Sequence, residues 1–222
     1  MTSESYERRR KTMPKQTFFN LPEEKRERIL KEAVMEFKNN NYDVASVNRI
    51  VEKSGISKGS FYQYFKDKED LYIYIMTIIG EKKIEYLTPT LMNFNELNFY
   101  EALREMYRVG IQFALENPDY LEIGTRMMRD TSGIMLKIRD TFSPKGDEMF
   151  IALLEKGQKM GDIRLDLDLK LVAKLLISMQ MSVVDYYFEK HQDEGYSMKI
   201  MEELDKFFDL LKNGISQKEG EK

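Results

Sequence analysis

The stretch Val47–Phe65, VNRIVEKSGISKGSFYQYF, limits the possible folds more than any other part of the 222-residue chain. Its first half has apolar residues at helical spacing, which predicts a short helix. Gly55 then ends that helix, because glycine adopts the positive φ angle of a sharp turn without strain. Ser57 can cap a second short helix, and Ile56 and Phe61 are placed to fill the crossing between the two. The pattern therefore predicts a helix-turn-helix.

Packing would use the apolar residues of the second short helix and leave a small polar face. The residues on or near that face are Lys58, Gly59, Ser60, Tyr62 and Gln63. The face is nearly uncharged, with one ammonium and one phenol. A helix of this kind can enter the major groove of DNA and read base edges, and its glycine would let the backbone approach bases or sugars closely.

Apolar residues recur at helical spacing through most of the chain, whereas the period-two alternation of strands persists nowhere, so we expect an all-α fold. Asn20 is expected to cap the first helix, with Pro22 in its first turn. A junction between helices is expected at Asp140–Pro144. The expected helices cover approximately residues 20–39, 46–54, 57–65, 67–88, 95–116, 118–129, 149–160, 169–190 and 197–213.

The net charge of −3 is divided unevenly along the chain. Residues 1–70 carry 15 Lys and Arg against 12 Asp and Glu, whereas the remaining residues carry 20 against 26. A mildly basic N-terminal part followed by an acidic remainder fits a small N-terminal domain that binds a polyanion. The chain has no cysteine, no apolar secretory signal, and no uncharged apolar run longer than Leu175–Val184. Because a membrane span needs about 18 apolar residues, we expect a soluble, cytoplasmic protein with no membrane partner.

Residues 17–71 resemble the TetR/AcrR (tetracycline-repressor) family of bacterial transcription regulators. The residues that carry the resemblance are ILKEAVMEFKNNNYDVASVNRIVEKSGISKGSFYQYFKDKEDL. Two positions depart from the family's pattern: Ala45 stands where Thr is usual, and Val51 stands where such units more often have Ala. The first departure removes one phosphate contact of the family or passes it to Ser46.

The resemblance implies a three-helix, helix-turn-helix DNA-binding head at the N-terminus and a larger helical domain after it. Residues 1–16 are then a disordered basic tail, residues 17–66 the DNA-binding domain, and residues 67–222 the effector-binding and dimerisation domain. The residues implied to face bases or sugars are Asn48, Lys58, Gly59 and Tyr62, and those implied to hold phosphates are Ser46, Ser60, Tyr64 and Lys68. Core packing is the alternative for the two tyrosines, and a solvated charge is the alternative for the two lysines.

Two heads held at a fixed separation would read a two-fold site, so we expect a homodimer. The helix at 169–190 is apolar nearly all round and needs partners on every side, which makes it the candidate interface together with the last helix. The candidate dimer residues are Val172, Leu176, Val183, Tyr187, Leu204 and Phe208. Met and aromatic residues suit an adaptable pocket for a small apolar or amphipathic effector, although each alone also suits a core. The candidate pocket residues are Tyr107, Phe113, Met127, Met128, Met179 and Tyr186.

The expected function is a ligand-responsive regulator, a repressor by the family's habit, that an effector releases from a palindromic double-stranded DNA operator. The alternative is a DNA-binding dimeric scaffold or protein-docking regulator without an effector. An enzyme is disfavoured, because His191 is the only histidine and the sequence has no Gly-rich phosphate loop or two-histidine metal spacing. Asp162, Asp166 and Asp168 fit a capped turn better than a catalytic cluster. We expect no metal and no cofactor.

Overall fold

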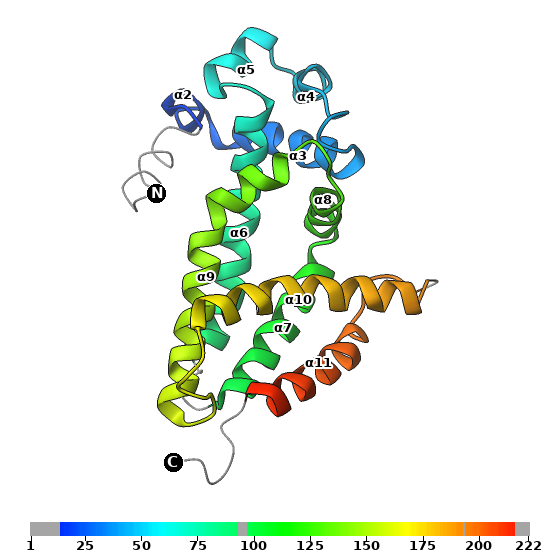
Figure 1. Ribbon diagram of the computed structural model, residues 1–222. Coiled ribbons are helices and arrows are strands. Elements are labelled where there is room, and N and C mark those ends of the chain that lie inside the picture. The colour runs from blue at the N-terminus through cyan, green and yellow to red at the C-terminus, as the bar shows by residue number, and fades with distance from the viewer. Residues whose placement is uncertain (1–13, 93–96, 193, 216–222) are drawn as a thin grey trace. The chain divides into compact units, whose positions relative to one another are not determined.

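The computed structural model describes residues 14–92, 97–192 and 194–215, and every regular element in these ranges is an α-helix (Figure 1). The prediction of an all-α fold is therefore confirmed. The chain divides into two compact units. The first unit takes Met1–Lys82 and Asn117–Thr141, and the second takes Lys83–Glu116 and Phe142–Lys222.

The first unit contains the helix-turn-helix. Its helices are α2 (Gln16–Phe19), α3 (Glu23–Asn39), α4 (Val47–Ser54), α5 (Lys58–Tyr64), the start of α6 (Lys68–Met92), α8 (Pro118–Met128) and the start of α9 (Ile134–Met160). The side chains at the centre of this unit are Ile29, Phe37, Ile50, Phe61, Phe65 and Leu71, each with at most 1% of its surface exposed. The pattern of apolar residues that predicts these helices is thus the pattern that fills the core.

Helix α8 belongs to the first unit because it packs on α3. The Arg126 guanidinium donates hydrogen bonds to the Lys38 carbonyl at 2.6 Å and to the Asn41 side chain at 3.1 Å. The Lys38 ammonium in turn forms an ion pair with Asp119 at 2.7 Å. Arg126 thereby satisfies a carbonyl at the C-terminal end of α3, where backbone acceptors lack helical partners.

The second unit is built on the remainder of α6 and α9 with α7 (Phe99–Glu116), α10 (Leu169–Lys190) and α11 (Ile200–Ile215). Helix α11 packs against both α7 and α10. Arg104 on α7 forms a bidentate ion pair with Asp205 on α11, with N–O distances of 2.6 and 2.9 Å. Gly157 allows a close approach of neighbouring side chains, since a Cβ there would lie 2.7 Å from Ile163 Cγ1.

Two of the aspartates considered as a carboxylate cluster serve the N-termini of helices instead. Asp162 accepts a hydrogen bond from the Phe99 N–H at the start of α7, at 2.8 Å. Asp168 caps α10 by accepting hydrogen bonds from the N–H groups of Lys170 and Leu171. These contacts satisfy backbone donors that the first turn of a helix leaves unpaired. They match the capped-turn interpretation of this segment.

Three local expectations differ from the structure. Asn20 follows α2 rather than capping α3, whose N-cap position is held by Pro22 without a side-chain bond. Helix α6 continues through Pro89 to Met92, since a proline this close to a helix end removes only one hydrogen bond near the last turn. Helix α9 runs unbroken across Asp140–Pro144, so the expected junction there is wrong.

The start of the first unit and the course of α6 bear on the expected tail and domain boundary. Residues 1–13 lie outside the described residues, but Lys15 is held by backbone hydrogen bonds and α2 begins at Gln16. The domain boundary expected between residues 66 and 67 stays a prediction. Helix α6 contributes to both units, and α8 joins the first unit through its contacts with α3.

Candidate nucleic-acid interface

The turn between α4 and α5 has the geometry that the sequence predicts. Gly55 ends α4 with a φ angle of 66°, in the left-handed region that favours glycine. The Ile56 N–H donates to the Val51 carbonyl at 3.0 Å. Ser57 caps α5, because its hydroxyl accepts a hydrogen bond from the Ser60 N–H at 3.0 Å. Two short helices are thus joined by one tight turn.

The outward face of this motif carries most of the residues predicted to contact DNA. Asn48 on α4 and Lys58, Gly59 and Tyr62 on α5 are exposed, with 45% of Tyr62 accessible to solvent. Ser60 is half-buried, and its hydroxyl lies 2.9 Å from that of Ser57. The exposed groups are an amide, an ammonium, a phenol and bare backbone, which can bond to base edges and phosphates.

Tyr64 is the predicted contact that the structure places in the core. Only 6% of its surface is exposed, and its ring is tilted against that of Phe18 with centroids 6.1 Å apart. Little of this side chain is left to hold a phosphate, which favours the packing alternative. The reason is that Tyr64 lies three residues after the buried Phe61 and therefore on the same, inward face of α5.

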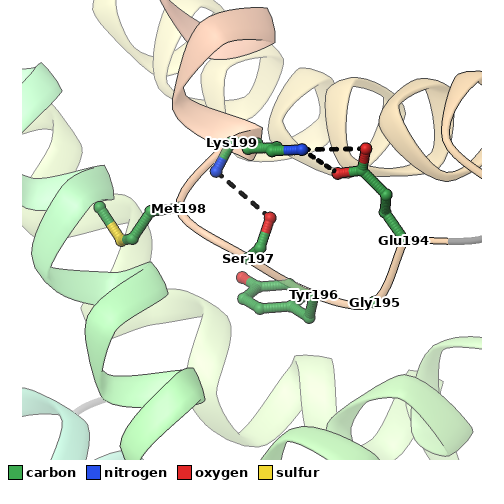
Figure 2. A pocket seen from close by; sticks show the side chains of 6 residues that line it. All are labelled: Glu194, Gly195, Tyr196, Ser197, Met198 and Lys199. Carbon is green, nitrogen blue, oxygen red and sulfur yellow. Dashed lines mark hydrogen bonds and ion pairs between the residues drawn. The ribbon is translucent and has the colours of Figure 1, made fainter.

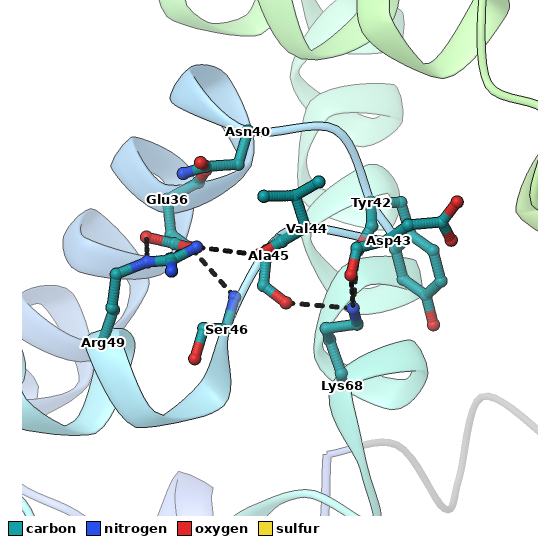
Figure 3. A network of polar contacts seen from close by, with 9 residues as sticks. All are labelled: Glu36, Asn40, Tyr42, Asp43, Val44, Ala45, Ser46, Arg49 and Lys68. Carbon is teal, nitrogen blue, oxygen red and sulfur yellow. Dashed lines mark hydrogen bonds and ion pairs between the residues drawn. The ribbon is translucent and has the colours of Figure 1, made fainter.

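Ser46 is held in place by a buried carboxylate, that of Glu36, which also pairs with Arg49 and which the sequence pattern did not reveal (Figure 3). Glu36 on α3 is 3% exposed and accepts hydrogen bonds from the Ser46 N–H at 2.8 Å and from Arg49 Nε at 2.9 Å. Burial alone would raise the pKa of Glu36, but the hydrogen bonds from Arg49 and Ser46 outweigh it and lower that pKa. The carboxylate therefore ties α3 to the start of α4, and the Ser46 hydroxyl is not used to cap the helix.

Lys68 has partners inside the protein (Figure 3). Its ammonium donates hydrogen bonds to the backbone carbonyls of Tyr42, Asp43 at 3.3 Å and Ala45 at 2.9 Å. Burial is the first cause that lowers the pKa of Lys68. The predicted phosphate contact by this residue stays a prediction, and the structure assigns its ammonium to the loop between α3 and α4. A pattern of residue types cannot show such a contact, because its acceptors are backbone carbonyls.

Four of the candidate dimer residues lie in the core of the second unit. Leu176, Tyr187, Leu204 and Phe208 are at most 6% exposed, whereas Val172 and Val183 are partly buried against the same core. A side chain buried in its own chain has no area left for a partner. The exposed apolar residues of α10 are Leu171, Leu175, Met179 and Tyr186, which recur at intervals of four and seven and so form one stripe.

Helix α10 as a whole is long and apolar enough to cross a membrane, although its uncharged apolar run, Leu175–Val184, is too short to do so. Within the described residues it is the one helix long and apolar enough to cross a membrane, with 17% of its most apolar window buried. Core helices of soluble proteins pass the same test. The charged residues Lys174 and Asp185 bound the uncharged run at its two ends. A search for an unbroken apolar stretch therefore does not find the membrane-like length of the whole helix.

The six candidate effector residues are divided between the two units. Met127 and Met128 lie in the first unit, and the other four lie in the second. The Tyr107 ring packs 5.4 Å from that of Phe208, and the Phe113 ring packs 5.7 Å from that of Tyr86. Tyr107 and Phe113 are thus core residues, and the exposed Met179 and Tyr186 belong to the stripe on α10.

A pocket lies in the second unit, in the connection between α10 and α11 (Figure 2). It is lined by residues of one continuous segment, Glu194–Lys199. The Lys199 ammonium bridges both oxygens of Glu194, at 3.0 and 2.8 Å. Because the charges in this segment are paired with each other, the pocket offers an effector no unpaired charged group of its own.

The buried apolar faces of α4 and α5, their tight turn and their exposed polar face define a helix-turn-helix DNA-binding protein. Residues 29–75 match the family described as bacterial regulatory proteins, tetR family. A solved TetR family transcriptional regulator from Chloroflexus aurantiacus is 30% identical, with a TM-score of 0.63, and the match covers 93% of this chain and 100% of that one. The chain belongs to the TetR family, whose members are transcriptional regulators and not enzymes.

Two further relatives are more distant in sequence. The uncharacterized HTH-type transcriptional regulator YdgC of Bacillus subtilis is 28% identical over 165 residues, which are 70% of this chain and 77% of that protein. The transcriptional regulator FadR from Bacillus subtilis, solved in complex with stearoyl-CoA, has a TM-score of 0.66 at 19% identity. That match covers 85% of this chain and 98% of FadR, and it supports the fold.

Proposed function

We propose that this protein is a homodimeric, ligand-responsive repressor that binds a two-fold symmetric operator in the cytoplasm. The observation that carries the proposal is the exposed face of α5, where Lys58, Gly59 and Tyr62 stand clear of the core while Phe61 is fully buried. A helix with a small polar face of this kind fits the major groove. The half-buried Ser46, at the N-cap of α4, and Ser60, on α5, are proposed to contact phosphates.

The proposed dimer uses the stripe on α10 formed by Leu171, Leu175, Met179 and Tyr186. These side chains are between 38 and 55% exposed, and an exposed apolar stripe on a long helix is best covered by an identical stripe in an isologous contact. A partner subunit, rather than a membrane, is the proposed cover, because the same chain carries a DNA-binding head. Two heads would then meet half-sites centred about 34–36 Å apart or a multiple of that distance.

The operator can be identified by selection from random DNA. The purified protein is mixed with random-sequence duplexes, bound DNA is amplified through several rounds, and the enriched sequences are compared. We expect an inverted repeat, protected by the protein at a stoichiometry of two chains per duplex. Enrichment of no sequence, or of a single half-site bound by one chain, would contradict the proposal.

For the effector, we propose an amphipathic molecule with a long apolar part, and acyl-CoA thioesters are the first class to test. The support is the related fold of FadR, which was solved with stearoyl-CoA. An effector would bind better to a conformation in which the spacing of the two DNA-binding heads does not match the operator. Because coupling between two sites is reciprocal, the effector weakens DNA binding by the same free energy by which DNA weakens effector binding, typically about 1–3 kcal/mol. A chain-length series of acyl-CoAs should raise the melting temperature and release the selected operator at the same concentrations.

A dimeric scaffold without an effector remains the second candidate. It is favoured by the packing of Tyr107 against Phe208 and of Phe113 against Tyr86. Tyr107 and Phe113 are expected to line a pocket, but these contacts place both side chains in the core. If acyl-CoAs and a broad panel of hydrophobic compounds change neither the melting temperature nor operator binding, the scaffold is the better description. The operator selection is unaffected by this outcome and tests DNA binding separately.

A further inference from the structure

Three consecutive carbonyls at the C-terminal end of α5 accept hydrogen bonds from the segment that precedes α3. The Lys15 ammonium donates to the Tyr62 carbonyl at 2.7 Å. The Thr17 hydroxyl donates to the Gln63 carbonyl, and the Lys15 N–H donates to the Tyr64 carbonyl at 2.9 Å. Since the Phe61 carbonyl already accepts from a backbone N–H within the turn, these bonds satisfy the carbonyls that α5 itself leaves unpaired.

These bonds matter because α5 is only seven residues long. A helix of this length is marginal on its own, and its position depends on tertiary contacts. A cation at the C-terminus of a helix also interacts favourably with the partial negative charge of the last carbonyls. Lys15 supplies that cation at the carbonyl of Tyr62. The side chain of Tyr62 is the most exposed aromatic group on α5.

Phe18 anchors this segment to the core of the first unit. Its side chain is 1% exposed, and its ring lies 4.9 Å from that of Phe65 and 5.9 Å from that of Tyr74. The carbonyl acceptors on α5 are therefore bonded to a segment that is itself fixed. The segment also lies before residues 29–75, the part of the chain that matches the family, so the match assigns it no role.

We propose that Lys15, Thr17 and Phe18 form a clamp that positions α5 for reading DNA. The three are positioning residues that touch no base in this role: Lys15 and Thr17 bond to the backbone of α5, and Phe18 anchors their segment to the core. The clamp holds the peptide of Tyr62 while the Tyr62 ring stays exposed. This inference rests on the proposed function, because it assumes that α5 is the helix that contacts base edges.

Thr17 gives the cleanest test, because removing its hydroxyl changes no charge. The Thr17→Val variant keeps the shape of the side chain and loses the bond to the Gln63 carbonyl, whereas Thr17→Ser keeps the hydroxyl. Thr125→Val is the matched control, since the Thr125 hydroxyl also donates to a backbone carbonyl, that of Leu121, in a different helix of the same unit. Lys15→Met is a secondary variant, because a lost lysine also alters the attraction to DNA.

Hydrogen exchange of the protein without DNA is the first measurement. We expect the backbone amides of α5 to exchange about three- to tenfold faster in Thr17→Val, which corresponds to the loss of one hydrogen bond. Thr17→Ser should restore the wild-type rate, and Thr125→Val should leave α5 unchanged. Equal exchange of α5 in Thr17→Val and the wild type would overturn the clamp.

DNA binding is the second measurement, with the selected operator and an unrelated duplex compared at one salt concentration. A loosened α5 should lower operator affinity about three- to tenfold and leave affinity for the unrelated duplex unchanged, because phosphate contacts carry the latter. Retained preference for the operator in Thr17→Val, or an equal loss on both duplexes, overturns the clamp alone. A wild-type protein that prefers no sequence overturns the proposed function, and with it the role of the clamp in reading DNA.

Discussion

The Lys68 ammonium lies 4.5 Å from the centre of the Tyr42 ring and donates a hydrogen bond to the carbonyl of the same residue. Further hydrogen bonds reach the carbonyls of Asp43 and Ala45. An ammonium has three donors, so these acceptors engage all of them. The start of α6 is therefore tied to the loop that leads into α4 and carries Ser46.

Replacing Lys68 by Met should destabilise the first unit. The variant keeps the apolar stem but leaves the loop carbonyls without their donor, so we expect the free energy of unfolding to fall by about 1–3 kcal/mol. Chemical denaturation measures this change, and Lys66→Met, at an exposed neighbouring lysine, is the control. If Lys68→Met unfolds like the wild type but binds all duplexes more weakly, with a salt slope smaller by about 1, Lys68 acts mainly as a phosphate contact.

Asp70 is the buried carboxylate of the first unit whose charge is poorly compensated. It is 3% exposed, its Oδ2 accepts a hydrogen bond from the Lys66 N–H at 2.8 Å, and its buried Oδ1 has no protein partner. Burial is the main cause that raises the pKa of Asp70, although the Lys66 hydrogen bond opposes it. A raised pKa in the folded state means that the neutral carboxyl is favoured there.

Asp70→Asn should therefore stabilise the protein at neutral pH, by about 1 kcal/mol, because an amide keeps an acceptor for the Lys66 N–H without a buried charge. The contribution of the neutral carboxyl to stability is present below the unfolded pKa and is lost as the pH rises through the raised folded pKa. The advantage of the variant should thus vanish below about pH 4. Denaturation curves from pH 3 to 8 test this, and a variant less stable at every pH would show that the charge at the start of α6 is favourable.

The helix-turn-helix could be predicted from sequence because its determinants are local. Gly55 sets the turn, Ser57 caps α5, and Phe61 fills the crossing, all within a few residues of one another. The segment Gln16–Phe19 could not be predicted, since a single helical turn has no periodicity to detect. Its importance comes from contacts with α5 across more than 40 residues of chain, which residue types alone do not encode.

The faces of α10 illustrate a second limit of sequence reasoning. The helix is apolar nearly all round, so periodicity cannot tell which side packs into the chain and which remains exposed. Leu176 and Tyr187 are among the residues predicted for the dimer contact, whereas the structure buries both and exposes Leu171 and Leu175. The Glu36–Arg49 pair was missed for a related reason: its members lie 13 residues apart, on two helices that only the fold brings together.

Leu175→Asp should dissociate the proposed dimer. Leu175 lies in the middle of the exposed stripe on α10 and is 46% exposed, so a carboxylate there costs the isolated chain little. At an isologous contact the two carboxylates would be desolvated near each other, which strongly opposes association. Light scattering coupled to gel filtration measures the mass, with Leu165→Asp, at a 77% exposed residue outside any helix, as the control. A dimer that survives Leu175→Asp would place the interface elsewhere.

Tyr62→Ala should reduce discrimination among DNA sequences. The Tyr62 ring is exposed beside the fully buried Phe61, so its removal leaves the core intact. One good base contact discriminates by about 1–3 kcal/mol, and we expect operator affinity to fall accordingly while affinity for unrelated DNA changes little. Tyr62→Phe separates the hydroxyl from the ring. Full operator affinity and selectivity in Tyr62→Ala would exclude this residue from base recognition.

Gly55 and Gly59 lie four residues apart and should respond to alanine in opposite ways. Gly55 has a φ angle of 66°, and nothing lies within 4 Å of an added Cβ, so alanine there would cost backbone strain of about 1–2 kcal/mol without a clash. Gly59 lies inside α5 without a positive φ angle, and an added Cβ would meet only the Ser57 hydroxyl at an ordinary 3.7 Å. Alanine at Gly59 therefore fits the folded protein.

Gly59→Ala should raise the free energy of unfolding by about 0.5–1 kcal/mol, because alanine in a helix loses less conformational entropy than glycine. The same methyl group would stand on the exposed face of α5, where the backbone is proposed to approach bases or sugars, so operator affinity should fall. Chemical denaturation and operator titration of the one variant measure both effects. Since a stabilised protein that binds more weakly cannot owe the loss to unfolding, this result would place Gly59 at the DNA contact; unchanged operator affinity would remove it from the interface.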